Sequence, residues 1–166
     1  MDTQHHSDYI EPSVFVAAGA IILGDVHIGA QSSVWFNAVI RADTDRVAIG
    51  ESTNVQDGVI IHVDAGAPCL IGNGVTIGHR AVVHGALVED DVLIGIGAIV
   101  LSGAKIGRES ILGAGTLVTG GTIVPPRSLV LGVPGRVVRS LSDEEVASIK
   151  SGATRYVQYS AQYRGA

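Results

Sequence analysis

Three histidines in the middle of the chain have the residue type and spacing to act as ligands of one metal ion. They are His62, His79 and His84 of a 166-residue sequence. A neutral imidazole is a common zinc ligand, and catalytic zinc takes three protein ligands and a water molecule. The metal lowers the pKa of that water to about 7, so hydroxide forms at neutral pH. The alternative is a set of unrelated surface histidines, and the expected fold decides between the two.

A six-residue repeat of aliphatic side chains provides the elements that would position these histidines. The clearest run is Val88, Ile94, Val100, Ile106, Leu112, Val118, Val124 and Val130, and an earlier run is Ile10, Val16, Ile22, Ile28, Val34 and Ile40. Such periodicity is typical of a parallel β-helix, in which three hexapeptides form one triangular coil with the aliphatic residues stacked inside. The sequence therefore predicts a mainly β fold of about seven coils.

The repeat places two of the histidines on adjacent coils in the same register. His62 and His84 each follow an aliphatic core position, and they are 22 residues apart, which is one coil plus a four-residue insertion. Arg41 stands one coil and a three-residue insertion before His62. We therefore expect Arg41, His62 and His84 to form a ladder that points outward along one edge of the solenoid.

His79 falls on the preceding face of the coil that carries His84. Its neighbour in register, one coil earlier, is Asp57, with Asn54 and Gln56 close by. Within one chain, His79 is expected to lie too far around the triangle to share a ligand sphere with the other two histidines. A second copy of the chain, packed around a threefold axis, would bring its own His79 beside them.

Four stretches of the sequence resemble the γ-class carbonic anhydrase family. They are residues 39–43 (VIRAD), 54–62 (NVQDGVIIH), 77–85 (IGHRAVVHG) and 131–135 (LGVPG). The resemblance covers nearly the whole chain. The spacing of the three histidines relative to the Arg-x-Asp and Asn-x-Gln-Asp motifs is specific, whereas the hexapeptide repeat alone is shared with many acyltransferases.

The resemblance implies a left-handed parallel β-helix that assembles as a homotrimer with one metal at each subunit interface. His62 and His84 of one subunit and His79 of its neighbour would bind Zn²⁺, with Fe²⁺ or Co²⁺ as other candidates. The resemblance also implies roles around the metal for further residues. Gln56 would lie beside the metal-bound hydroxide, and Arg41, Asp43 and Asp57 would form an interface ion-pair network. Asn54 would be a supporting hydrogen-bonding residue, and Tyr159, from the C-terminal segment, would approach the site.

The implied reaction is the reversible hydration of carbon dioxide to bicarbonate. One departure from the family is that the loop after His62 is short: residues 63–70 contain a single carboxylate, Asp64, and no glutamate, and position 44 is Thr44. The chain therefore resembles a short-loop subgroup in which a proton shuttle is missing and anhydrase activity is not assured. The alternatives are an acyl-CoA thioesterase or acyltransferase, or a catalytically silent metal-binding trimer.

The pattern changes after residue 140. Ser142 and Glu145 predict a capping box, and Leu141 with Val146 predicts a hydrophobic staple, at the start of a C-terminal helix. We therefore expect one domain with an N-terminal segment (1–9), a β-helix (10–140) and a helix packed on it (141–166). His5, His6 and His27 lie outside the predicted site.

Composition excludes several classes of partner. The formal net charge is −5 and there is no basic stripe, so nucleic acid is not an expected ligand. No apolar run is long enough for a membrane span, and the N-terminus lacks the apolar core of a signal peptide. The single cysteine, Cys69, is compatible with a reducing compartment. Together these features predict a cytoplasmic protein.

Overall fold

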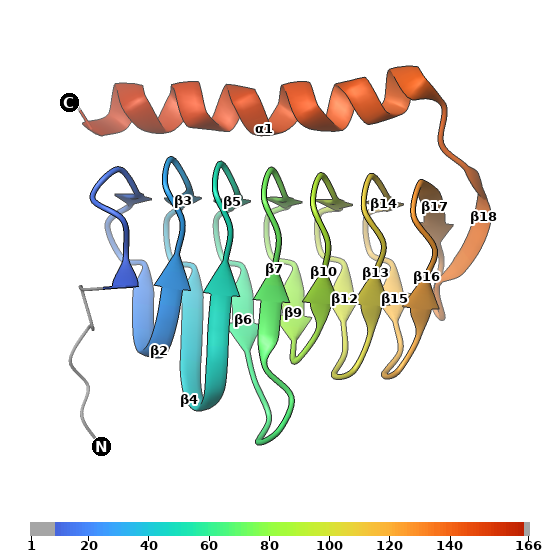
Figure 1. The fold of residues 1–166 in the computed structure, drawn as a ribbon, viewed down its shortest axis with the longest axis horizontal. Helices are drawn as coiled ribbons and strands as arrows, with labels where there is room; N and C mark the ends of the chain where they lie inside the picture. The colour runs from blue at the N-terminus through green and yellow to red at the C-terminus, as the bar shows by residue number, and fades with distance from the viewer. Residues whose placement is uncertain (1–8, 165–166) are drawn as a thin grey trace.

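The computed structural model describes residues 9–164 and consists of stacked parallel coils with one long helix lying along them (Figure 1). The strands form three faces of a solenoid. One face lies beneath the helix and is called here the helix face. It is a sheet of eight strands in the spatial order β1 (Phe15–Val16), β3 (Ser33–Val34), β5 (Asn54–Val55), β8 (Thr76–Ile77), β11 (Leu93–Ile94), β14 (Ile111–Leu112), β17 (Ser128–Leu131) and β18 (Arg136–Ser140), of which β18 is antiparallel.

The other two faces are joined by long strands that run from one to the next. The face that carries His62 and His84, called here the histidine face, contains the first parts of β2 (Ile21–Ile28) and β4 (Val39–Ile49), followed by β6 (Ile60–His62), β9 (Val82–His84), β12 (Ile99–Val100) and β15 (Leu117–Val118). The third, called here the open face, contains the last parts of β2 and β4, followed by β7 (Cys69–Ile71), β10 (Leu87–Val88), β13 (Lys105–Ile106) and β16 (Ile123–Val124).

The inward positions of the repeat form one continuous aliphatic core, as predicted. Ile40, Ile61 and Ile94 are fully buried, and every member of the run from Val88 to Val130 is at most 2% exposed. Two positions at the start of the repeat differ: Ile10 is only half-buried, and Val16 is 43% exposed although the repeat predicts an inward position. Val16 lies in β1, at the edge of its sheet, where β3 is its only paired strand among the described residues. The end of a solenoid has no further coil to bury its last side chains.

The C-terminal helix α1 (Asp143–Arg164) begins at the predicted capping box. The backbone N–H of Glu145 donates to Ser142 Oγ at 3.3 Å, and the backbone N–H of Ser142 donates to Glu145 Oε2 at 2.9 Å. Leu141 and Val146 are both buried in one apolar cluster, so the predicted staple is present. The helix packs over β1, β3, β5 and β8, which covers the helix face.

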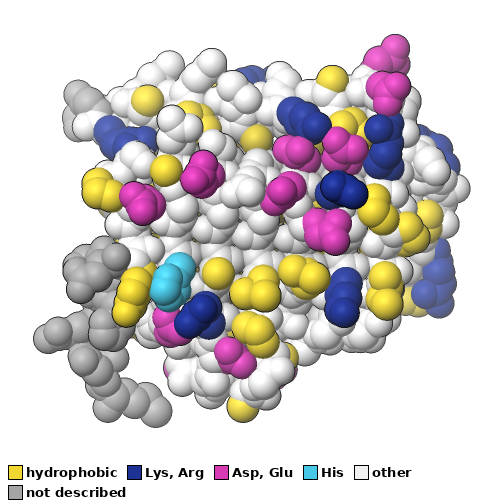
Figure 2. Space-filling model, viewed as in Figure 1, with side chains coloured by type: hydrophobic (Ala, Val, Ile, Leu, Met, Phe, Trp, Pro, Cys, Tyr) yellow, Lys and Arg dark blue, Asp and Glu magenta, His cyan; other side chains and the backbone are white. Residues whose placement is uncertain are grey.

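The outward side chains differ between the two faces that the helix leaves uncovered. On the open face the outward row contains a histidine and a lysine, and Figure 2 shows hydrophobic and charged side chains side by side there. On the histidine face the row is wholly aliphatic: Ile21, Val39, Ile60, Val82, Ile99 and Leu117.

Within residues 9–164, no helix has the length and apolar character needed to cross a membrane.

Candidate metal centre

The structure brings Arg41, His62 and His84 together as adjacent rungs of one ladder. β4 pairs with β6 so that Arg41 is opposite His62, and β6 pairs with β9 so that His62 is opposite His84. Each residue follows an inward aliphatic position, so its own side chain points outward. The two insertions in the repeat leave this register intact, because the first only lengthens β4 between the histidine face and the open face, and the second forms the loop between β6 and β7.

The two imidazole rings of the ladder face each other. His62 Nδ1 lies 2.9 Å from His84 Nε2. Two ring nitrogens this close need a proton on one of them or a cation between them, because two bare lone pairs repel. Nitrogens that are each about 2.0–2.1 Å from one zinc ion can be at most about 4.1 Å apart. The spacing of the two rings is therefore compatible with two ligands of one metal.

Asp43 holds the far side of the His62 ring. Its Oδ1 lies 3.0 Å from His62 Nε2, and its other oxygen forms an ion pair with Arg41. The hydrogen bond with His62, followed by the bond and charge of Arg41, keeps the pKa of the Asp43 carboxyl below its ordinary value of 3.8. An ionised carboxylate only accepts hydrogen bonds, so the His62 proton belongs on Nε2 and Nδ1 is left bare toward His84.

His84 is held on its far side by residues that the sequence did not indicate as a unit. Its Nδ1 lies 2.9 Å from Ser102 Oγ, and Ser102 Oγ donates to Asp64 Oδ2 at 2.7 Å. A metal-binding histidine commonly has its other ring nitrogen bonded to a carboxylate or another acceptor. Asp64 is recognisable in the sequence as the single carboxylate of the loop after His62, whereas the repeat does not indicate Ser102, because the ladder position on that coil is Leu101.

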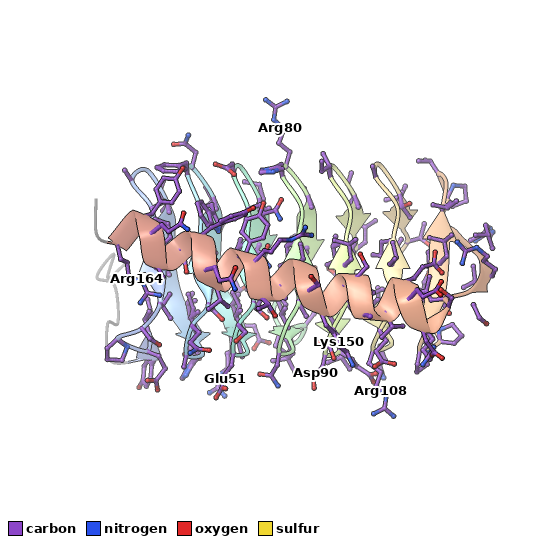
Figure 3. All side chains as sticks on the ribbon, turned by 90° about the horizontal axis from the view of Figure 1, so that it is seen from above. Glu51, Arg80, Asp90, Arg108, Lys150 and Arg164 are labelled. Carbon is purple, nitrogen blue, oxygen red and sulfur yellow. The ribbon has the colours of Figure 1, made fainter. Side chains whose placement is uncertain are left out.

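His79 lies at the opposite edge of the histidine face. It precedes β9, which ends at His84, and its Nδ1 lies 2.9 Å from Asp57 Oδ2. Its side chain is 43% exposed. The next residue, Arg80, extends away from the solenoid in Figure 3, so this corner projects outward. Among the residues that the structure describes, no three His, Cys, Asp or Glu side chains are close enough together to hold a metal ion.

Gln56 and Asn54 form the support of the His79 corner. The backbone N–H of His79 donates to Gln56 Oε1 at 3.2 Å, and Gln56 Nε2 donates to Asn54 Oδ1 at 3.0 Å. Asn54 in turn donates to Thr76 Oγ1 at 2.9 Å. Both side chains are buried. Within one chain the two predicted site residues therefore lie with His79 and not with the facing pair.

The ion pairs of Arg41 and Asp57 lie at opposite edges of the histidine face. Arg41 pairs with Asp43 at the edge of the facing histidines, whereas Asp57 pairs with His79 at the other edge. An Arg41–Asp57 pair is not present among residues 9–164. The interface network that the resemblance implies would thus need two subunits.

Tyr159 lies over the side of the molecule that carries Asp57. Both residues line a hollow of about 390 Å³, together with Trp35, Phe36, Tyr156, Gln162 and Tyr163. The Tyr159 side chain is exposed, and its ring is 5.7 Å from that of Tyr156. Burial, and then the negative charge of Asp57, raise the pKa of Tyr156. The structure therefore places Tyr159 near the His79 edge.

Cys69 and His27 do not belong to the ladder. Burial raises the pKa of the Cys69 thiol to about 12, so it is not a nucleophile at neutral pH. His27 pairs with Asp25 at 2.8 Å, away from the ladder. His5 and His6 lie outside the described residues.

Comparison with known proteins agrees with the hexapeptide-repeat fold. Residues 85–120 match the family described as Bacterial transferase hexapeptide (six repeats). A solved structure of a Bacillus cereus protein, named as a candidate acetyltransferase, superimposes with a TM-score of 0.93 at 39% identity and covers 94% of this chain and 91% of that one. The overall shape of the solenoid and its helix is thus shared with a solved structure.

Several relatives carry a carbonic anhydrase name. The chain is 55% identical over 151 residues to the "Probable carbonic anhydrase" of Methanocaldococcus jannaschii, with 91% of this chain and 95% of that protein covered. It is 42% identical to "Gamma carbonic anhydrase 1, mitochondrial" of Arabidopsis thaliana, covering 89% of this chain. It covers only 56% of that plant protein, or about half its length. With more than half of its residues identical over nearly the full length of the archaeal relative, the chain belongs to the γ-class carbonic anhydrase family.

Proposed function

We propose that this protein catalyses the reversible hydration of carbon dioxide to bicarbonate at a metal ion shared between subunits of a homotrimer. His62 and His84 of one subunit and His79 of the next would be the ligands. The observation that carries the proposal is the pair of imidazoles whose ring nitrogens face each other at 2.9 Å, each held on its far side by an oxygen acceptor or hydroxyl.

The donor set fits a divalent metal ion. Three neutral imidazoles suit zinc, and also Fe²⁺ or Co²⁺. When bound, the metal would lower the pKa of a water molecule to about 7 and so supply hydroxide at neutral pH. The protein's own contribution is to fix the ring orientations, through Asp43 on His62, Asp57 on His79 and Ser102 on His84.

The histidine face supports the trimer. It carries the facing pair on one edge and His79 on the other, and its outward row between them is wholly aliphatic. Ile21, Ile60 and Ile99 are 37–45% exposed in the single chain. An exposed apolar patch of this kind marks a protein interface. A threefold ring buries the face of every copy and places the His79 edge of one beside the facing pair of the next.

The residues around His79 would complete the site from the neighbouring subunit. Gln56 is held by Asn54 and by the His79 backbone, so it has a fixed position from which to orient the substrate. Arg41 of one subunit and Asp57 of the next would come together at the same interface. The aliphatic row would exclude bulk water from it. We expect the assembly to act in the cytoplasm.

The first experiment is stopped-flow measurement of carbon dioxide hydration on protein purified without oxygen and analysed for bound metal. The proposal expects one metal per subunit and turnover that depends on it. His79→Ala should lose both at every interface. Turnover that persists in metal-free protein, or wild-type protein that binds no metal when zinc is supplied, would overturn the proposal.

An acyltransferase or thioesterase is the second candidate, because the similar Bacillus cereus structure is named as a candidate acetyltransferase. An acyltransferase would use one histidine as a general base and bind coenzyme A between coils. Here both ring nitrogens of His62 are already engaged, by Asp43 and His84. Stoichiometric metal without hydration would favour a metal-dependent thioesterase or a silent scaffold, and hydrolysis of acetyl-CoA separates those two.

A further inference from the structure

Ser102 lies between a carboxylate and a metal-ligand candidate. Its Oγ is 2.7 Å from Asp64 Oδ2 and 2.9 Å from His84 Nδ1. The direct distance from Asp64 Oδ2 to His84 Nδ1 is 3.6 Å, which is too long for a hydrogen bond. Asp64 and His84 are therefore linked by hydrogen bonds only through the Ser102 hydroxyl.

The Ser102 hydroxyl can donate one hydrogen bond, and the chemistry of its two partners determines which of them accepts it. A carboxylate accepts only, so the Ser102 proton goes to Asp64. The remaining partner, His84 Nδ1, must then donate to Ser102 Oγ. We propose that Ser102, oriented by Asp64, is a positioning residue that holds His84 with its proton on Nδ1 and its Nε2 bare. This inference rests on the proposed function for what the bare nitrogen binds.

The tautomers of His62 and His84 together determine what can lie between the two rings. Asp43 leaves His62 Nδ1 bare, and Ser102 leaves His84 Nε2 bare, so two lone pairs face each other at 2.9 Å. The opposite tautomer of His84 would place a proton in that space and make a hydrogen bond between the rings. By selecting the first tautomer, Ser102 turns a possible histidine–histidine hydrogen bond into a cation site.

The local backbone holds Ser102 in place. Gly85 follows His84 with a φ of +52°, and a Cβ there would lie 3.0 Å from both Ser102 Oγ and the carbonyl oxygen of Ala67. Glycine at this position lets the serine approach the ring. The N–H of Gly103 donates to the Gly85 carbonyl at 2.8 Å, and a tight turn that joins Asp64 to Ala67 fixes the carboxylate.

The test compares Ser102→Ala with Ser102→Thr, which restores a hydroxyl. Thr119→Ala is the matched control, since its hydroxyl lies one coil further along and, within residues 9–164, forms a hydrogen bond only with Thr122, at 3.0 Å. Zinc affinity is measured by competition with a chelator, and Co²⁺ spectra report the ligand geometry. The tautomer of His84 is read from ¹⁵N chemical shifts of the metal-free protein at mildly alkaline pH.

We expect Ser102→Ala to bind zinc roughly 10-fold more weakly or worse, with a changed Co²⁺ spectrum and a shift of the His84 proton toward Nε2. Ser102→Thr should restore all three, and Thr119→Ala should resemble the wild type. Asp64→Ala should weaken zinc binding in the wild type but add little to Ser102→Ala.

Two results would distinguish a failure of this inference from a failure of the proposed function. An unchanged zinc affinity and an unchanged His84 tautomer in Ser102→Ala would overturn the inference and leave the proposed function intact. Wild-type protein that binds no zinc would overturn the proposed function, and the tautomer measurement on the metal-free protein would still decide whether Ser102 positions His84.

Discussion

Asp57 Oδ2 lies 2.9 Å from His79 Nδ1, on the opposite edge of the histidine face from His62 and His84. The negative charge beside Nδ1 favours the tautomer of His79 that carries its proton on that nitrogen, and in this tautomer Nε2 is bare. In the proposed trimer, each edge of the face would contribute part of one metal site. Within residues 9–164 of a single chain, no three such side chains come together at either edge.

This division makes a subunit-mixing experiment decisive. His79→Ala and His62→Ala should each lose metal and activity as pure oligomers. In mixed oligomers, a His79→Ala subunit still offers its facing pair to the intact His79 of a His62→Ala neighbour. We therefore expect co-expression of the two variants to restore part of the metal content and activity.

The control for this experiment is Arg80→Ala, because Arg80 is exposed beside His79 and points away from the solenoid (Figure 3). It should keep its metal. If the mixed oligomers bind no more metal than the pure variants, the ligands come from a single chain and the shared site is wrong.

The aliphatic row predicts which surface the copies share. Ile60→Asp places a charge at the centre of the histidine face, where the wild-type side chain is 38% exposed, and should dissociate the trimer and release its metal. Ile123→Asp is the matched control on the open face, where the side chain is 70% exposed. Sedimentation velocity and metal analysis measure both effects. A stable trimer with full metal in Ile60→Asp would place the interface elsewhere.

Much of the fold and the ladder could be predicted from sequence, because a solenoid converts residue spacing directly into position. Counting in units of one coil placed Arg41, His62 and His84 side by side, and the strand register agrees. The predicted helix cap at Ser142 is present for a similar reason, since capping depends on residues close together in the chain.

The contacts that periodicity missed are those made at corners. Ser102 contacts His84 although Leu101 occupies the ladder position, because the chain turns at residue 102 and the serine side chain points toward the His84 ring. Gln56 supports the His79 backbone through a side-chain contact that reaches across coils. Val16 is exposed because it lies at the end of the stack. Such contacts depend on side-chain rotamers and chain ends, which a six-residue repeat does not describe.

The surroundings of the facing histidines predict that proton release depends on the buffer. Asp43 is engaged by Arg41 and His62, Asp64 by Ser102, and Thr44 donates to the Val63 carbonyl at 3.3 Å. No glutamate is present in the loop to carry the proton away. We expect kcat to rise with the concentration of an imidazole-type buffer, while kcat/KM stays constant because it reports the steps before proton release.

Stopped-flow measurements over a range of buffer concentrations at constant ionic strength check this prediction. A non-transferring buffer of the same charge serves as the control. A kcat that does not change with buffer concentration would mean that the protein provides its own proton carrier.

The cap of α1 predicts an acid-sensitive contribution to stability. Glu145 accepts two hydrogen bonds from Arg139, each at 2.8 Å, and one from the Ser142 backbone at 2.9 Å. Arg139 first, and then the Ser142 N–H, lower the pKa of Glu145 from 4.5 to about 2. Between these two values the unfolded chain binds more protons than the folded one, so stability falls as the pH falls.

The stabilisation by ionised Glu145 is therefore fully present above pH 4.5 and is lost as the pH falls toward about 2. Glu145→Gln should lower Tm at neutral pH, and its difference from the wild type should shrink across that window. Glu144→Gln is the control, because the Glu144 side chain forms no ion pair or hydrogen bond within residues 9–164 and shares the same helix terminus. Thermal unfolding followed by circular dichroism at a series of pH values measures the difference. If the Glu145→Gln difference is the same at every pH, the arginine and the backbone N–H do not stabilise the charged carboxylate.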